Sequence, residues 1–181
     1  MTRTLRFPWY LCVPLLLPLA FPIRGAVTDL RAWQLSRQAE TRQNLALFDE
    51  ALALRRQAVL ARPGDARAQL ALAERARGLW YFRDTETLRR EADVAFGRAT
   101  ELSPHWPVPH YEHARMYAFK AQHARALSLL APALDLDPNN AGYWLERARL
   151  LGALGRATEA RAAYGRCLGL KWSRECERGA R

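Results

Sequence analysis

The four-residue pattern Glu-x-Ala-Arg occurs three times along the chain. Its copies are Glu74-Arg75-Ala76-Arg77, Glu112-His113-Ala114-Arg115 and Glu146-Arg147-Ala148-Arg149. A guanidinium presents a planar fork of donors that fits carboxylates and phosphates, so three successive copies predict a surface that binds anionic groups. The alternative is that each arginine pairs with the glutamate three residues before it, which contributes only about 0.2–0.5 kcal/mol on an exposed helix. The sequence leaves both interpretations open.

Residues suited to catalysis or metal binding do not form a recognisable set. The sequence contains no Gly-x-Ser-x-Gly motif and no glycine-rich phosphate loop, which mark common hydrolases and nucleotide-binding enzymes. His110 and His113 would share one helical face, but no third ligand follows at a spacing typical of a metal site. We therefore predict that the protein is not an enzyme and has no catalytic residue, metal or cofactor.

Two of the three cysteines, Cys167 and Cys176, belong to the part of the chain that should fold, whereas Cys12 lies in an apolar leader. Three cysteines are too few for a disulfide scaffold and lack the paired spacing of zinc ligands. In an exported protein Cys167 and Cys176 could form a disulfide, provided that the fold brings their Cα atoms within reach.

The chain carries a formal net charge of +10, almost wholly from arginine, since Lys120 and Lys171 are its only lysines. Such a balance favours acidic partners: acidic protein segments, phosphate backbones or anionic lipid surfaces. A GC-rich genome would produce the same bias, and charge alone identifies no ligand. A charge-driven nucleic-acid or lipid binder is therefore kept as an alternative to a protein-binding module, with nucleic acid the less favoured partner.

The positions of small and turn-forming residues reveal an internal repeat. Pro104 and Pro138 lie 34 residues apart, and the step of 12 residues from Ala114 to Ala126 recurs from Ala148 to Ala160. A period of 34 residues is typical of helical hairpins that stack on their neighbours to bury their apolar faces.

Four such hairpins are predicted, followed by a short charged tail. They cover residues 29–65, 66–104, 107–138 and 141–172, and the tail is 173–181. The second hairpin has four additional residues, about one helical turn, which should lengthen its tip around Tyr81–Thr87. We expect the tail to form either a capping turn or a disordered end.

The repeat resembles the tetratricopeptide repeat (TPR) family. In the fourth unit the residues that carry the resemblance are Trp144, Ala148, Leu151, Ala160, Tyr164 and Cys167. The resemblance implies an all-α, right-handed superhelical solenoid whose concave groove, lined by the first helix of each hairpin, binds peptides or partner proteins without catalysis.

The resemblance also implies which side chains face that groove. It directs Arg77, Arg115 and Arg149 toward the concave side, where they would receive a protein or peptide partner with acidic groups. Tyr111 and Phe119 would add apolar contact area, and Trp80 is expected to pack in the core instead.

Residues 1–26 are predicted to form a signal peptide or an N-terminal membrane anchor. Arg3 and Arg6 precede a charge-free, leucine-rich run from Leu11 to Phe21, and the apolar segment 7–23 could associate with a membrane. Its prolines would strain a membrane helix, while the cleavage site before Val27 is poor, so cleavage and anchoring both stay open.

Either route predicts a bacterial protein that is periplasmic or anchored in the inner membrane facing the periplasm. A leader followed by arginine- and alanine-rich repeats also resembles the soluble tail of O-antigen ligase and polymerase membrane proteins. That resemblance implies an adaptor in envelope polysaccharide assembly. Similar single-anchor repeat proteins also assist cytochrome maturation or secretion machines, and the sequence does not choose among these pathways.

Overall fold

The computed structural model describes residues 27–41 and 47–181, and the chain divides into two compact units at Pro63 and Gly64. The predicted leader, residues 1–26, lies outside the described residues. The described ranges contain helices and turns and no strand. None of the helices in these ranges is both long enough and apolar enough to cross a bilayer.

The first unit contains a helical segment at residues 27–41 and α2 (Phe48–Ala61). Alanines pack between them, because Ala39, Ala51 and Ala58 are buried. Arg62 Nε lies 3.2 Å from Asp29 Oδ1, so an ion pair joins the end of α2 to the start of the first helical segment.

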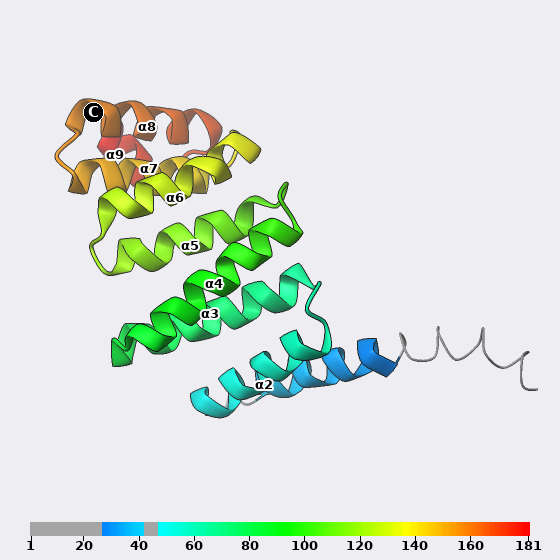
Figure 1. Ribbon diagram of the computed structural model, residues 1–181. Helices are drawn as coiled ribbons and strands as arrows, with labels where there is room; N and C mark the ends of the chain where they lie inside the picture. Colours follow the sequence, from blue (N-terminus) through cyan, green and yellow to red (C-terminus); the bar gives the residue numbers. More distant parts are fainter. Residues whose placement is uncertain (1–26, 42–46) are drawn as a thin grey trace, which may run out of the picture. The chain divides into compact units, whose positions relative to one another are not determined.

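The second unit consists of three helical hairpins and one further short helix. Its elements are α3 (Ala66–Arg83), α4 (Glu86–Leu102), α5 (Pro107–Phe119), α6 (His123–Leu136), α7 (Ala141–Ala153), α8 (Ala157–Leu170) and α9 (Arg174–Ala180). Helices that follow one another in sequence lie next to each other, and the hairpins stack in chain order (Figure 1). The predicted fold class, an all-α stack of helical hairpins, is confirmed.

Local sequence sets where these helices begin. The carboxylate of Asp65 accepts hydrogen bonds from the backbone N–H groups of Arg67 and Ala68, at 2.9 and 3.2 Å, and so caps α3. Asn140 caps α7 in the same way by accepting from the Gly142 N–H at 3.0 Å. Each such cap stabilises its helix by about 1 kcal/mol, because it satisfies donors that have no partner within the helix.

Small residues at equivalent positions let the helices of the second unit approach closely. The repeated alanines that are buried are Ala76, Ala92, Ala114, Ala126, Ala148 and Ala160. Phe96, Tyr117 and Leu151 fill the space between neighbouring helices and are fully buried. Trp80 is 4% exposed, so it packs in the core.

The hairpin formed by α3 and α4 has the longest helices of this unit. The two helices have 18 and 17 residues, whereas α5 to α8 have 13 or 14. The chain bends at Asp84, whose φ of 49° is left-handed. Lys120 Nζ, in the next turn, lies 2.7 Å from Asp84 Oδ1 and 5.0 Å from the Trp80 ring centroid. These contacts fix the longer tip against the third hairpin.

The C-terminal tail is a helix rather than an isolated turn or a disordered end. Ser173 Oγ accepts from the Cys176 N–H at 3.1 Å and caps α9. A disulfide joins Cys176 to Cys167 of α8, with a Cα–Cα distance of 5.9 Å, and Cys176 is fully buried. Residues 173–181 therefore belong to the packed repeat unit, because a buried covalent link and a capped helix hold them against α8.

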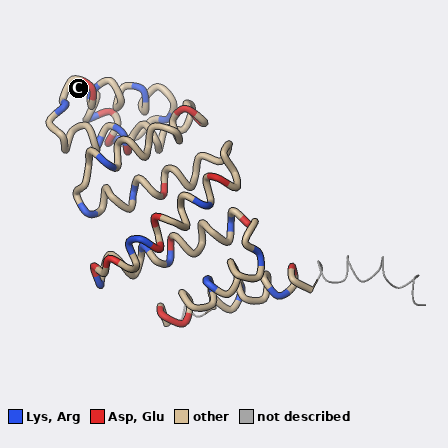
Figure 2. The backbone as a smooth tube through the Cα atoms, viewed as in Figure 1, with Lys and Arg blue, Asp and Glu red and all other residues tan. Residues whose placement is uncertain are grey.

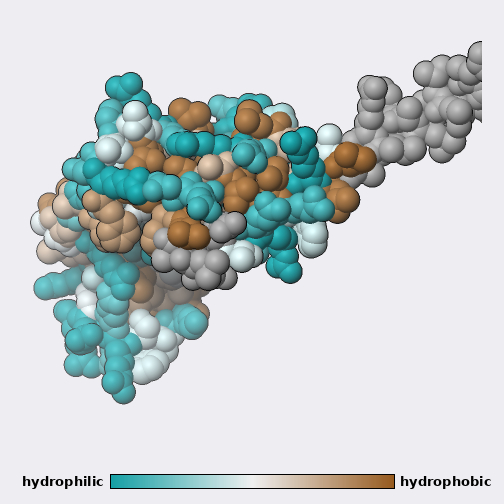
Figure 3. All heavy atoms as spheres, turned by 90° about the horizontal axis from the view of Figure 1, so that it is seen from below, coloured by the Kyte–Doolittle hydropathy of each residue, from teal (hydrophilic) through white to brown (hydrophobic). Residues whose placement is uncertain are grey.

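Charged and apolar residues both reach the surface of the molecule. Positions with either charge are interspersed along the helices of the second unit (Figure 2). Among exposed apolar side chains are Phe82, Val94 and Phe119, and hydrophobic residues lie between hydrophilic ones on the face drawn in Figure 3. Acidic positions therefore occur among the arginines along these helices.

Candidate partner-binding groove

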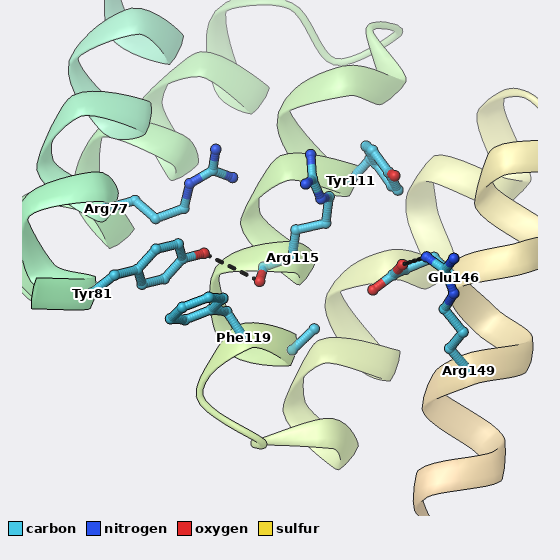
Figure 4. A pocket seen from close by; sticks show the side chains of 8 residues that line it. Arg77, Tyr81, Tyr111, Arg115, Phe119, Glu146 and Arg149 are labelled. Atoms are coloured by element: carbon cyan, nitrogen blue, oxygen red, sulfur yellow. Dashed lines mark hydrogen bonds and ion pairs between the residues drawn. The ribbon is translucent and has the colours of Figure 1, made fainter.

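A cavity of about 370 Å³ opens between the first helices of the three hairpins, α3, α5 and α7. Its lining consists of Arg77, Tyr81, Tyr111, Arg115, Ala118, Phe119, Glu146 and Arg149 (Figure 4). We call this cavity the groove. It combines aromatic rings with charged groups that come from three successive repeats.

All five residues that the sequence assigned to a concave binding surface line the groove. Arg77 comes from α3, Tyr111, Arg115 and Phe119 from α5, and Arg149 from α7. Each arginine directly follows a buried alanine, so the packing of that alanine fixes the direction of its neighbour. Tyr81, which the sequence placed at the tip of the second hairpin, also lines the groove.

Arg77 binds a glutamate of the next repeat. Its Nη1 lies 2.6 Å from Glu112 Oε2 and 2.9 Å from the Glu112 carbonyl oxygen. The two side chains are only 15% and 13% exposed, so this ion pair is largely shielded from water. A pairing confined to one helix, as the alternative interpretation proposed, therefore does not describe Arg77.

Arg115 lies at the centre of the groove and is half exposed. Its Nη1 is 3.1 Å from Glu112 Oε1 of the same helix, and its Cζ is 5.6 Å from the Tyr111 ring centroid. Burial lowers the pKa of Arg115, but the nearby Glu112, Tyr111 and Glu146 together outweigh that effect and the net pKa is raised. The guanidinium is therefore permanently charged.

Arg149 is held by the C-terminal helix. Its Nε and Nη2 donate to the two carboxylate oxygens of Glu175 at 2.7 and 2.6 Å, a bidentate pair. The Glu146 carboxylate is farther away, at 3.5 Å from Arg149 Nη1. The hydrogen bond with Glu175 raises the pKa of Arg149, and the same bond lowers the pKa of Glu175.

The aromatic part of the groove is held in place by stacking. The rings of Tyr81 and Phe119 are 4.0 Å apart and nearly parallel, and the Tyr81 hydroxyl donates to the Arg115 carbonyl oxygen at 3.3 Å. Phe119 is nevertheless 65% exposed, which leaves apolar area for a ligand. The ring centroids of Tyr111 and Tyr143, which is on α7, are 4.8 Å apart, so this contact links two repeats.

A second polar cluster, centred on Asp93, joins α4 to α5 outside the groove. The Asp93 carboxylate accepts from the Tyr117 hydroxyl at 2.6 Å and from Arg89 Nη1 at 2.6 Å, and His113 Nε2 lies 2.8 Å from it. Burial raises the pKa of Asp93, but hydrogen bonds from His113 and Tyr117 outweigh it and leave the pKa lowered. Burial and the Asp93 carboxylate raise the pKa of Tyr117 to about 12.

Sequence reasoning missed this cluster. It considered His113 only as a weak metal-ligand candidate, whereas the ring pairs with Asp93 and stacks on Phe96 at 5.0 Å. Within residues 27–41 and 47–181, no group of three His, Cys, Asp or Glu side chains is arranged to hold a metal ion. The sequence feature that could have indicated the cluster is Asp93, an acidic residue directly after the buried alanine Ala92.

No protein-family model and no curated protein sequence matches this chain. Solved structures do match it. A thermophilic TPR protein of Thermus thermophilus, TTC0263, is similar with a TM-score of 0.67 and 21% identity over 94% of both chains. The fold is that of the tetratricopeptide repeats.

Two other solved proteins share this TPR fold. MamA matches with a TM-score of 0.65 and 17% identity over 79% of this chain and 75% of its own. Pseudomonas aeruginosa PilF matches with a TM-score of 0.63 and 15% identity over 80% of this chain and 63% of its own. The predicted resemblance to TPR proteins is confirmed at the level of the fold.

Proposed function

We propose that this protein is a non-enzymatic scaffold that holds a protein partner in the groove between α3, α5 and α7. One observation carries the proposal: three successive first helices each place an arginine on one cavity, and α3 and α5 add aromatic rings, of which Phe119 is exposed. The TPR fold, which is built for protein interaction, supports it. Tyrosine and arginine are also the side chains that contribute most often to binding energy at protein interfaces.

The groove suits a peptide segment because it offers two kinds of contact side by side. The stacked rings of Tyr81 and Phe119 provide apolar area at a low entropic cost, since they are already ordered. Arg115, within the same cavity, provides charge-assisted hydrogen bonds. A segment of a partner protein can satisfy both with neighbouring side chains, so acidic groups are the proposed recognition feature at Arg115.

The proposed setting is the bacterial cell envelope, with the repeats in the periplasm. The apolar leader supports export, and the disulfide between Cys167 and Cys176 fits an oxidising compartment. Within the envelope, the proposed pathway is polysaccharide assembly of the O-antigen type. Protease accessibility of a C-terminal tag in spheroplasts tests the compartment, and the mass of the purified protein distinguishes a cleaved signal from a retained anchor.

Site-specific photocrosslinking in the native cell tests the proposed groove. The crosslinking amino acid p-benzoylphenylalanine replaces Phe119 in the groove or, as a control, Val94 on α4, which is similarly exposed at 72%. We expect a discrete adduct from position 119 only, and loss of that adduct when Arg115→Glu is added. Identical adducts from both positions, or an adduct that survives Arg115→Glu, would contradict the proposal.

Salt dependence separates this function from charge-driven binding. Apolar contacts at Tyr81 and Phe119 are not screened, so the crosslink should persist in spheroplasts at about 0.5 M salt. An association made only by arginines and a phosphate-rich surface would be lost steeply over the same range.

A further inference from the structure

The copies of the pattern place the arginine of one first helix opposite the glutamate of the next. We call each such Arg–Glu position between neighbouring repeats a step. Arg77 pairs with Glu112 at 2.6 Å, and Arg149 pairs with Glu175 at 2.6 Å. Glu175 begins a similar stretch that lacks the alanine, Glu175-Cys176-Glu177-Arg178, on α9. α9 therefore provides the acidic half of a step although it is only one short helix.

The middle step, between Arg115 and Glu146, is open. Both residues line the groove, but in the described second unit Arg115 and Glu146 form no ion pair with each other. Glu112, the carboxylate nearest to Arg115, is already bonded to Arg77 at the shorter distance of 2.6 Å. Arg149, the cation nearest to Glu146, is likewise bonded more closely to Glu175.

We propose that this open step binds a segment of the partner protein that carries both charges. A carboxylate of the segment binds Arg115, a neighbouring lysine or arginine binds Glu146, and an apolar or aromatic residue packs on Tyr81 and Phe119. This inference rests on the proposed function, since it specifies the chemistry of the segment that the groove holds.

Local charge favours a mixed segment over a purely acidic one. At these steps the positive and negative charges are equal in number, although the chain carries +10 overall. The residues are Arg77, Arg115 and Arg149, which face Glu112, Glu146 and Glu175. The Glu146 side chain is only 13% exposed and its closest cation is 3.5 Å away. A shielded carboxylate without a close donor attracts a cation and repels a second carboxylate.

The affinity of peptides that differ only in the charges of two residues tests the proposal. The probes are N-acetylated, C-amidated, fluorescein-labelled nonapeptides with one phenylalanine and two variable positions, Glu–Lys, Glu–Glu, Lys–Lys or Gly–Gly, at every spacing up to four residues. Binding to the full chain in mild detergent is measured by fluorescence anisotropy. We expect the best Glu–Lys probe to bind about three- to tenfold more tightly than the best Glu–Glu probe, the range of partly exposed charge pairs.

Glu146→Gln keeps the shape of the side chain and removes its charge. It should weaken binding of Glu–Lys probes by about three- to tenfold and strengthen binding of Glu–Glu probes, because repulsion is relieved. The matched control is Glu101→Gln on α4, whose carboxylate is 66% exposed and pairs with Arg98 at 2.8 Å. This control should leave all affinities unchanged, and circular dichroism checks the fold of both variants.

The outcomes separate the inference from the proposed function. If Glu–Glu probes bind wild type best, or Glu146→Gln does not weaken Glu–Lys binding, the mixed-charge inference is wrong while a groove for acidic segments stands. If Arg115→Glu changes no affinity, or no probe binds better than the Gly–Gly set, the proposed function fails and the inference fails with it.

Discussion

Replacing Asp93 with asparagine tests whether the buried cluster between α4 and α5 holds the second and third hairpins together. The carboxylate is 20% exposed and receives hydrogen bonds from Arg89 and Tyr117, both at 2.6 Å, with His113 at 2.8 Å and Arg125 at 3.6 Å. Hydrogen bonds to a charged group contribute about 1.5–3 kcal/mol each and are not additive. Because asparagine keeps part of this network, we expect Asp93→Asn to lower the free energy of unfolding by about 2 kcal/mol at pH 7.

The pH dependence of that loss has a defined sign. Hydrogen bonds from His113 and Tyr117 overcome the effect of burial and hold the pKa of Asp93 in the folded protein below its ordinary value. A lowered folded-state pKa contributes stability above the unfolded-state value of about 3.9, and the contribution disappears as pH falls through the folded-state pKa. The difference between wild type and Asp93→Asn should therefore be present between pH 7 and about 5 and shrink below about pH 4.

Urea unfolding followed by circular dichroism at several pH values measures this difference. Asp135→Asn, at an exposed aspartate on α6, is the matched control and should change the unfolding free energy by less than about 0.5 kcal/mol. A difference that is absent at pH 7, or that stays the same down to pH 2.5, would refute the assignment of Asp93 as a charged, hydrogen-bonded link between hairpins.

Four other perturbations address the C-terminal helix and the arginines. Cys176→Ser opens a loop closed by a disulfide of sequence separation 9, so the free energy of unfolding in urea should fall by about 2.5 kcal/mol. Added reductant should lower the free energy of unfolding of the wild type but not that of the variant. Gly179→Ala places a Cβ against the Tyr164 ring, which should speed amide hydrogen exchange in α9 but not in α5. Arg77→Ala leaves Glu112 largely buried with a weaker partner, so it should cost about 2 kcal/mol of unfolding free energy. Arg115→Ala, at a half-exposed site, should cost under about 0.5 kcal/mol of unfolding free energy but reduce the yield of the crosslink from position 119.

The stacking of the repeats was predictable because it depends on residue size at fixed intervals. Ala114 and Ala148 are fully buried, as a helix-packing position requires, and the step of one repeat keeps the following arginine on the same side of the stack. Arg115 and Arg149 consequently line one groove with the aromatic residues of α5. The periodic pattern therefore predicts which residues share one side of the stack, even though no individual contact is known from the sequence.

Pairings between repeats could not be predicted from the sequence. Along one helix only partners three or four residues away are visible, which suggested Glu74 for Arg77. The distance from Arg77 to Glu112 depends instead on how α3 and α5 stack, and this distance is 2.6 Å. Asp93 was missed for the same reason, since its partners His113 and Tyr117 lie on the next hairpin.

The helical tail was unpredictable for a different reason. The 7 residues of α9 are too few to form a stable helix alone, since helix nucleation is unfavourable in short segments. α9 exists because a disulfide and the bidentate Arg149–Glu175 pair hold it against α8 and α7. Both contacts join residues on different helices, 9 and 26 residues apart along the chain.

The arginines of the repeated pattern are chemically identical but occupy different environments, and this difference makes Arg115 the arginine most accessible to a ligand. Arg77 is 15% exposed and Arg149 is held by two short hydrogen bonds, so releasing either guanidinium for a ligand would first break an existing ion pair. Arg115 is half exposed and shares its glutamate with Arg77, so a ligand carboxylate can bind it without that loss. Two arginines therefore stabilise the stack, and the affinity for a partner should depend mainly on Arg115.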